Sequence, residues 1–311
     1  MPIATRQLGR TGVDVTILGY GSMELWGQPV GPELTDRAAS QLLNAVLDTG
    51  INLIDTSVEY GRSEELIGRH VSHRRDEYFL ATKCGCPLQV PPGAQPPYPH
   101  DYSSVNVRAN VEQSLRRLRT DRLDLLQVHM SPSAAQLAAD DTVAALNALR
   151  DEGKLRFIGM SGILPHLPDH IATGVFDVFQ IPYSAVQREH ERLISEASAT
   201  GAGTLIRGGV ARGAPAEDKN WRVGPLGLAE GVGRRRWEDS DLADVLNGMT
   251  PMEFMLRFTL SHPDLSTTIV GTGNIDHLHA NVAVAEKGPL PAGVYERARK
   301  LLAGPADEGV S

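Results

Sequence analysis

The chain has 311 residues, of which 41% are hydrophobic and 22% are charged, a composition that supports a large buried core and excludes a disordered chain. The formal net charge of −8 gives no general attraction for phosphate backbones, so we expect no nucleic-acid partner. No apolar run approaches the about 20 residues that a membrane helix needs, and the N-terminus lacks the apolar centre of a signal peptide. We therefore expect a cytoplasmic protein without a membrane partner.

A β-hairpin is the first predicted element, in the segment "RQLGRTGVDVTIL", with its turn at Gly9 to Gly12. Eight short apolar runs follow, and helical stretches separate them. The predicted strands are residues 17–19, 52–54, 78–82, 124–128, 157–160, 175–180, 203–206 and 267–270. The predicted helices are residues 36–48, 63–70, 104–118, 142–152, 189–199, 251–260 and 276–286.

This alternation predicts the architecture. Most of the strands lack polar alternation, as strands buried on both faces must, and helical connections force neighbouring strands to pair in parallel. Eight such units predict an α/β fold of the closed (β/α)8 TIM-barrel type. No repeat, low-complexity tract or linker marks a second domain, so we predict one domain over residues 1–311.

Two long loops interrupt the rhythm, "CGCPLQVPPGAQPPYPHDYS" after the third barrel strand and residues 208–250 after the seventh. Loops at the carboxyl ends of barrel strands build the active site, so we interpret both as lids or binding elements, with a variable exposed insertion as the alternative. The run "GRRRWED" inside the second loop is interpreted as a solvated loop.

The only two cysteines are Cys84 and Cys86, which open the first of these loops. They are too close in sequence to staple the fold, and no second cysteine pair is present to complete a zinc site. We therefore expect no metal and interpret them as small residues that fill the loop.

Four side chains with useful chemistry follow three consecutive predicted strands. The segment "NLIDTSVEYGRSEELIG" places Asp55 and Tyr60 just past the second strand, Lys83 closes the third and His129 closes the fourth. Each residue alone has an ordinary structural explanation, such as a capping aspartate or a surface tyrosine. Because neighbouring strands lie only about 4.8 Å apart, however, the four side chains can converge.

Together these side chains suit proton transfer to an oxyanion. A tyrosine, with a pKa of about 10, needs a nearby cation to be a good acid at neutral pH. Lys83 can be that cation, Asp55 can keep it charged, and His129 can orient a carbonyl oxygen. No serine, cysteine or metal cluster is arranged as the nucleophile, so a hydride from a cofactor fits best. The chain contains neither G-x-G-x-x-G after a strand nor a P-loop, which leaves "IVGTGNIDHLHAN" as the candidate phosphate-binding stretch.

These residues resemble the aldo-keto reductase family. "GINLIDTSVEYGRSEELIG" looks like the first signature of that family, and Asp55, Tyr60, Lys83 and His129 match its catalytic tetrad. The resemblance spans nearly the whole chain. It implies a hairpin that closes the base of the barrel, a nicotinamide cofactor, and reduction of an aldehyde, ketone or sugar-like carbonyl with Tyr60 as the general acid.

The resemblance also implies the binding residues. By that likeness Asp55 contacts the nicotinamide ribose, Gln180 binds the carboxamide and Asn281 reads adenine. The full set of expected cofactor-binding residues is Gly21, Ser22, Met23, Asp55, Ser161, Gln180, Arg207, Gly208, Gly209, Gly271, Thr272, Gly273, His277 and Asn281. For the substrate we expect contacts from Tyr60 and His129 and from the loop tryptophans Trp26 and Trp221, with Trp237 as a further candidate.

Three departures from the family pattern bear on the cofactor. Gly162 replaces the asparagine that usually follows Ser161, and Arg207-Gly208-Gly209 stands where Ser-Pro-Leu is common. Gly271 and His277 stand where relatives that grip a 2′-phosphate often have a lysine and an arginine. We nevertheless expect NADPH as the cofactor, with an arginine from residues 234–236 completing the site and NADH as the second option.

Two other functions stay open at this point. A Schiff-base lyase would use Lys83 as its nucleophile, although a neighbouring Asp55 suppresses the free amine. A non-catalytic subunit that senses the cofactor, like the channel-associated relatives within the family, would retain the tetrad as well. The sequence makes no prediction of the oligomeric state.

Overall fold

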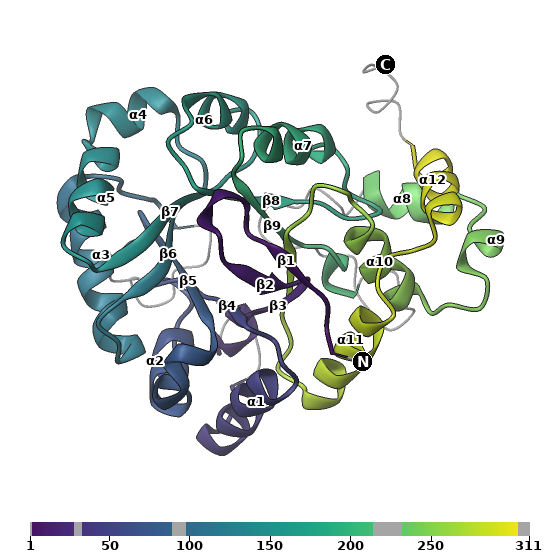
Figure 1. The fold of residues 1–311 in the computed structure, drawn as a ribbon, viewed down its shortest axis with the longest axis horizontal. Coiled ribbons are helices and arrows are strands. Elements are labelled where there is room, and N and C mark those ends of the chain that lie inside the picture. Colours follow the sequence, from purple (N-terminus) through teal and green to yellow (C-terminus); the bar gives the residue numbers. More distant parts are fainter. Residues whose placement is uncertain (1, 28–32, 89–97, 214–231, 304–311) are drawn as a thin grey trace.

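Eight parallel strands close into a barrel in the computed structural model, which describes residues 2–27, 33–88, 98–213 and 232–303 (Figure 1). The order around the barrel is β10-β3-β4-β5-β6-β7-β8-β9, and β9 pairs with β10 to complete the circle. This confirms the predicted (β/α)8 architecture and all eight predicted strands. Their bounds are Leu18–Gly21 (β3), Leu53–Asp55 (β4), Phe79–Cys84 (β5), Leu123–His129 (β6), Leu155–Ser161 (β7), Val178–Pro182 (β8), Gly203–Arg207 (β9) and Thr267–Val270 (β10).

The predicted hairpin is also present and lies across one end of the barrel (Figure 1). Its strands β1 (Thr5–Gln7) and β2 (Asp14–Thr16) pair antiparallel, and a 3-10 turn, η1 (Gly9–Thr11), lies in the connection. Leu8 is completely buried against the barrel interior. Gly9 has a φ of +50°, and a Cβ there would lie 2.2 Å from the backbone nitrogen of Gly203, so only glycine fits where the turn meets β9.

Helices surround the barrel, and every end of the seven predicted helices lies within about two residues of its observed position. Side-chain caps explain several starts, since Thr35, Ser103 and Thr250 each accept a hydrogen bond from a backbone N–H in the first turn. The bounds are Asp36–Asp48 (α1), Ser63–His70 (α2), Ser104–Leu118 (α3), Thr142–Asp151 (α5), Glu191–Ala199 (α7), Pro251–Leu260 (α10) and Ile275–Glu286 (α11).

Several helical segments were not predicted. They are Ala134–Ala139 (α4), Leu167–Thr173 (α6), Val232–Glu238 (α8), Ala243–Leu246 (α9), Ala292–Leu301 (α12) and the 3-10 turns Ser22–Leu25 (η2), Ser72–Glu77 (η3) and Ala211–Gly213 (η4). The interpretation of "GRRRWED" as a solvated loop is wrong, because most of it is helix α8. There Trp237 packs against Phe254 with ring centroids 5.8 Å apart, and Arg236 is buried.

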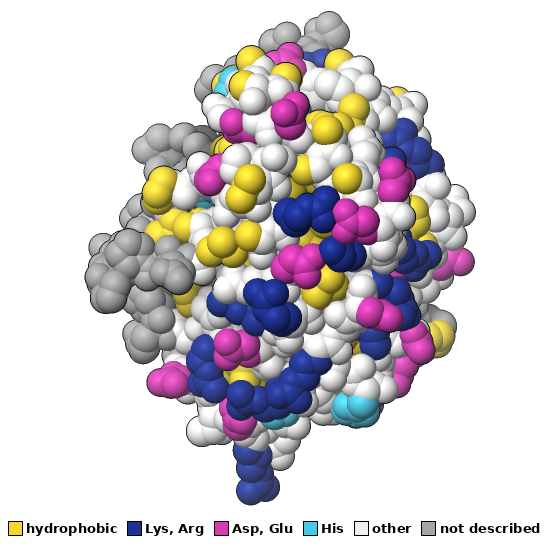
Figure 2. All heavy atoms as spheres, turned by 90° about the vertical axis from the view of Figure 1, so that its left-hand side faces the viewer, with side chains coloured by type: hydrophobic (Ala, Val, Ile, Leu, Met, Phe, Trp, Pro, Cys, Tyr) yellow, Lys and Arg dark blue, Asp and Glu magenta, His cyan; other side chains and the backbone are white. Residues whose placement is uncertain are grey.

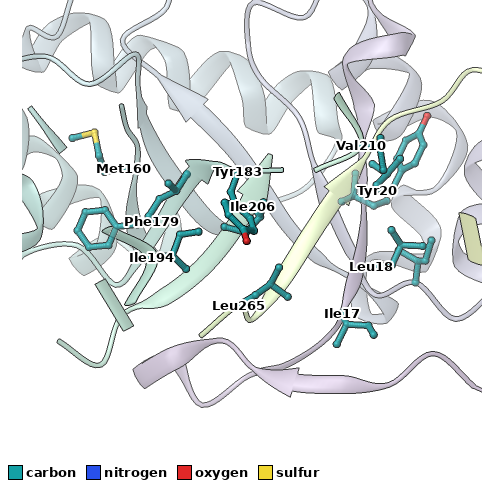
Figure 3. Packing of buried hydrophobic residues seen from close by; sticks show 14 of the residues in the cluster. Ile17, Leu18, Tyr20, Met160, Phe179, Tyr183, Ile194, Ile206, Val210 and Leu265 are labelled. Atoms are coloured by element: carbon teal, nitrogen blue, oxygen red, sulfur yellow. The ribbon is translucent and has the colours of Figure 1, made fainter. Parts of the chain in front are cut away.

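Two hydrophobic cores share the barrel strands. The larger one lies between the strands and the outer helices, and Figure 3 shows part of it, with Phe179, Ile194 and Ile206 close together. The smaller one fills the base of the barrel and consists of Leu8, Val15, Leu53, Phe79, Ala81, Leu125, Val178 and Leu205. Successive residues of a strand alternate between the two, so that Leu53 faces inward and Ile54 faces the helices.

The outer surface carries charges of both signs. Basic and acidic side chains lie beside one another on the face shown in Figure 2. Arg108 on α3 and Glu152 after α5 form one exposed ion pair, at 2.7 Å, of the kind that contributes little to stability. Within the described ranges, no helix is both long and apolar enough to cross a membrane. That residues 1–311 form a single domain stays a prediction.

Candidate active site

The inward-facing positions of the barrel strands change from apolar at the base to polar toward their carboxyl ends. In β4, for example, Leu53 belongs to the inner core and Asp55, two residues later, is the next inward position. The same step of two residues leads from Ala81 to Lys83 in β5. The other inward polar residues are Gln127 and His129 in β6, Ser161 in β7, Gln180 in β8 and Arg207 in β9.

Asp55 and Lys83 form a buried ion pair at the centre of this polar layer. The Lys83 Nζ lies 2.7 Å from the Asp55 Oδ2 and also donates to the carbonyl oxygen of Thr56 at 2.7 Å. Burial opposes the ammonium charge, but the attraction of Asp55 and Tyr60 outweighs it, so the pKa of Lys83 is raised. Lys83 is therefore a fixed cation at neutral pH.

The other oxygen of Asp55 is held by two amides. Its Oδ1 accepts hydrogen bonds from the Nε2 of Gln127 at 2.8 Å and from the Nε2 of Gln180 at 2.9 Å. The carboxylate thus links β4 to side chains from β5, β6 and β8. Because both oxygens of Asp55 accept hydrogen bonds, the buried charges of Asp55 and Lys83 are well compensated.

Tyr60 lies directly against this cation. The Lys83 Nζ is 4.9 Å from the centroid of its ring, and the ring stacks on Trp26 with centroids 5.3 Å apart. Burial raises the pKa of Tyr60, while the charges of Lys83 and Arg207 act in the opposite direction. The phenol is therefore protonated at neutral pH and has two cations near it to stabilise the phenolate.

His129 ends β6 and directs its Nδ1 toward Glu59, whose Oε1 is 3.2 Å away. Burial lowers the pKa of His129 despite the pull of that carboxylate, so the imidazole is neutral at pH 7. For Glu59 burial opposes ionisation, but its hydrogen bonds, that of His129 first, outweigh it and the pKa is lowered. The imidazole is thus held by a carboxylate through one ring nitrogen.

The first group of expected cofactor residues lies at the carboxyl ends of β3, β4, β7 and β8. Ser22, in the turn after β3, donates from its Oγ to the carbonyl oxygen of Asp55 at 2.8 Å, and Gly21 and Met23 flank it. Ser161 donates from its Oγ to the Oε1 of Gln180 at 3.0 Å. Gln180 therefore uses both ends of its amide inside the barrel.

The second group of expected cofactor residues follows β9 and β10. Gly271 lies so close to β3 that a Cβ would stand 2.7 Å from the carbonyl oxygen of Gly21. Asn274 caps α11, with its Oδ1 accepting from the backbone nitrogen of Asp276 at 2.8 Å. The remaining members are Arg207, Gly208, Gly209, Thr272, Gly273, the exposed His277 and the partly buried Asn281.

Two expectations for the loops fare differently. Trp26 is positioned against Tyr60, as described, whereas Trp221 lies outside the described residues. Trp237 packs on α10 instead of lining the mouth of the barrel. Arg234 pairs with Glu238 inside α8 at 2.7 Å, and Arg236 is buried, so these two cations are already engaged.

Three polar residues of this site were not predicted from the sequence. Gln127 lies two positions before His129, and the two-residue period of a strand could have placed it on the same inward face. Glu59 directly precedes Tyr60, and no motif or periodicity assigned it a role of its own. His100 stands in the long loop after β5, where no periodicity indicates which way a side chain points.

Comparison with known proteins identifies the family. The model of the aldo/keto reductase family matches residues 17–303. This chain belongs to the aldo/keto reductase family. It is therefore an oxidoreductase of a family that uses nicotinamide cofactors.

Individual relatives agree with that assignment. The chain is 28% identical to the L-galactose dehydrogenase of Arabidopsis thaliana over 299 residues, covering 90% of this chain and 88% of that protein. It is 31% identical to the NADH-specific methylglyoxal reductase of Escherichia coli K12 over 200 residues, 59% of this chain and 60% of that one. The holo form of aldo-keto reductase AKR11C1 from Bacillus halodurans superimposes with a TM-score of 0.82 at 28% identity, over 97% of each chain.

Proposed function

We propose that this aldo/keto reductase reduces the carbonyl group of an aldehyde, a ketone or a sugar-like compound to an alcohol, with Tyr60 as the general acid. One observation carries the proposal: the buried ion pair of Lys83 and Asp55, at 2.7 Å, lies 4.9 Å from the ring centroid of a protonated Tyr60. A cation next to a phenol stabilises the phenolate that remains after the phenol donates its proton. Without such a role, burying the charges of the ion pair only costs desolvation free energy.

Each member of the tetrad then has a distinct task. Tyr60 donates a hydrogen bond to the carbonyl oxygen and gives up its proton as negative charge develops there. Lys83 stabilises the phenolate that remains, and Asp55 keeps Lys83 charged. The Nδ1 of His129 is turned toward Glu59, so Nε2 is the ring nitrogen left for the carbonyl oxygen, and it orients that oxygen when it carries the ring proton. The bound nicotinamide supplies the hydride.

The residues expected to hold the nicotinamide dinucleotide fit that group. Gly208 has a φ of +72° and open space where a Cβ would stand, next to the cation of Arg207, which suits a pyrophosphate. The capped first turn of α11 presents backbone N–H groups that suit a further phosphate. Ser22, Asp55, Ser161 and Gln180 supply polar groups at the ends of β3, β4, β7 and β8 for the nicotinamide half.

A substrate screen tests the function. We expect steady oxidation of NADPH or NADH, followed by its absorbance, when the purified chain is given aldehydes, ketones and sugar-like carbonyls. Continuous turnover would exclude the alternative of a non-catalytic cofactor sensor. If the chain bound the cofactor tightly but oxidised it no faster with any carbonyl than without one, the sensor would be the better account.

We further propose that NADPH is preferred over NADH, with a modest ratio of kcat/KM values measured at equal ionic strength. The first turn of α11 can receive a 2′-phosphate, but Gly271 and His277 provide no fixed cation for it. The substitution His277→Arg should therefore raise the NADPH/NADH ratio about tenfold, the usual worth of a charged hydrogen bond to phosphate.

The matched control is His279→Arg, an equally exposed position two residues further along the same helix. It adds the same charge on a different face of α11 and should leave the ratio unchanged. A wild-type preference for NADH, or equal effects of both arginines, would contradict the proposed recognition of the 2′-phosphate.

Small carbonyl compounds are the proposed partners, and the cytoplasm is the proposed compartment.

A further inference from the structure

Four donor atoms, one of them from His129 of the tetrad, converge in an arrangement that catalysis of carbonyl reduction does not require. They belong to Glu59 after β4, Cys86 and His100 in the loop after β5, and His129 at the end of β6. Each of the four atoms lies within 4.8 Å of the other three. Cys86 is completely buried, and the side chains of Glu59, His100 and His129 are 8–10% exposed.

Hydrogen bonding alone does not satisfy this cluster. The Nδ1 of His129 lies 3.2 Å from the Oε1 of Glu59, 3.3 Å from the Sγ of Cys86 and 3.3 Å from the Nε2 of His100. A ring nitrogen has either one proton or one lone pair, so it can make one strong hydrogen bond among these three. The Oε2 of Glu59 is buried and has no hydrogen-bond partner among the described residues.

The tautomer of His100 directs a lone pair toward Glu59. Its Nδ1 lies 2.8 Å from the carbonyl oxygen of Tyr98, which can only accept, so Nδ1 carries the proton. In the neutral ring the lone pair is then on Nε2, directed at the cluster, and Nε2 lies 3.6 Å from the unpartnered Oε2 of Glu59. Two acceptors then face each other there, and this arrangement is favourable only with a proton or a metal cation between them.

The distances match a tetrahedral ion. Zn²⁺ binds nitrogen, oxygen and sulfur ligands at about 2.0–2.3 Å, which places neighbouring donor atoms about 3.3–3.8 Å apart. The four contacts above span 3.2 to 3.6 Å. The backbone carbonyl that fixes the ring of His100 is also the kind of partner that zinc-binding histidines have on their other nitrogen.

We propose that Glu59, Cys86, His100 and His129 form a binding site for Zn²⁺. The mixed thiolate, imidazole and carboxylate set favours zinc over Mg²⁺ or Ca²⁺, which select oxygen ligands. Four protein ligands close the coordination shell, as in sites that hold structure in place. On binding, the thiol proton of Cys86 leaves to solvent and a sulfur–zinc bond forms.

Coordination has a consequence for His129. Zinc on Nδ1 leaves the ring proton on Nε2, which is the tautomer that can donate a hydrogen bond to a carbonyl oxygen. Without the ion, a neutral ring that donates from Nδ1 to Glu59 has no proton on Nε2. This consequence rests on the proposed function, whereas the binding site itself does not.

Metal binding is measured directly, on the full chain after treatment with a chelator. We expect the wild-type chain to take up one Co²⁺, with the intense visible bands of tetrahedral cobalt and a sulfur-to-cobalt charge-transfer band, and Zn²⁺ to displace it. Excess Mg²⁺ should not displace the Co²⁺. Cys84→Ser is the matched control, because Cys84 is equally buried two residues away but lies outside the cluster, and it should bind as the wild type does.

The variants then decide the ligands. Cys86→Ser should abolish the charge-transfer band, and Glu59→Gln and His100→Ala should each weaken Zn²⁺ binding at least about tenfold. Should Cys86→Ser fail to fold by circular dichroism, the two other variants give the same decision. The proposal is overturned if the wild-type chain takes up no stoichiometric ion, or if the folded variants bind it as tightly as the wild type. Neither result depends on whether the chain reduces carbonyls.

Discussion

Replacing Tyr60 by phenylalanine is expected to lower turnover about 10²–10⁴-fold, the usual contribution of a general acid. The substitution removes only the hydroxyl group, because the ring keeps its stacking on Trp26 and its contact with Lys83. The fold and the affinity for the cofactor should therefore change little. Steady-state kinetics with a good carbonyl substrate and a cofactor titration measure the two effects separately.

Tyr78→Phe is the matched control for this experiment. Tyr78 is also buried under a cation, with the guanidinium of Arg75 5.3 Å from its ring centroid, but it lies at the start of β5 and Lys83 lies near the end. Turnover should be unchanged in this variant. A Tyr60→Phe enzyme that reduced its substrate at nearly the wild-type rate would remove Tyr60 from its assigned role.

The second large effect is expected for Lys83→Met, which should lower turnover at least about 10²-fold. Lys83 lowers the pKa of Tyr60, so its removal raises that pKa. The proton-donating form of Tyr60 then persists to higher pH, and the fall of the remaining activity on the alkaline side should move upward. A pH profile of kcat/KM in the direction of reduction measures the shift. An unchanged profile, with only weaker substrate binding, would place Lys83 in the substrate site instead.

Stability must be controlled in that experiment. Removing one partner of a buried ion pair costs about 3–5 kcal/mol, because it leaves Asp55 buried without its counter-ion. The double variant Asp55→Asn/Lys83→Met contains neither charge, and it should recover stability in thermal unfolding without recovering turnover. Borohydride trapping of the wild type with a carbonyl compound addresses the lyase alternative. A stable adduct on Lys83 would favour that alternative over carbonyl reduction.

The fold could be predicted because local and global signals agree. Eight apolar strand patterns and seven helical patterns alternate in the sequence, and capping residues such as Thr35 and Ser103 mark helix starts. The short helices α4 and α6 were not predicted because they contain too few turns to show a clear hydrophobic periodicity. Helix α8 was not predicted because a run of three arginines is typical of a solvent-exposed loop, whereas Arg236 is buried.

The site was predictable only where strand geometry or a signature fixed the positions. Asp55, Lys83 and His129 end strands, and parallel strands bring their carboxyl ends together. The cluster of Glu59, Cys86, His100 and His129 has no such rule, because loops bring its members together from positions 59 to 129. Counting cysteines alone gives no indication of this cluster, because the neighbours of Cys86 in it are histidines and a carboxylate.

The alternation of inward and outward residues constrains how this chain can vary. Along β4 to β9 the same strands present the inner core, the polar layer and the face toward the helices, each residue assigned by parity alone. Inserting a single residue within β5, before Thr82, would turn Lys83 toward the helices and Thr82 toward Asp55. Every residue of β5 after the insertion would then change from one face of the strand to the other. Inherited changes of length are therefore confined to the connecting loops, and new specificities in descendants of this chain would come from those loops around an unchanged proton-transfer centre.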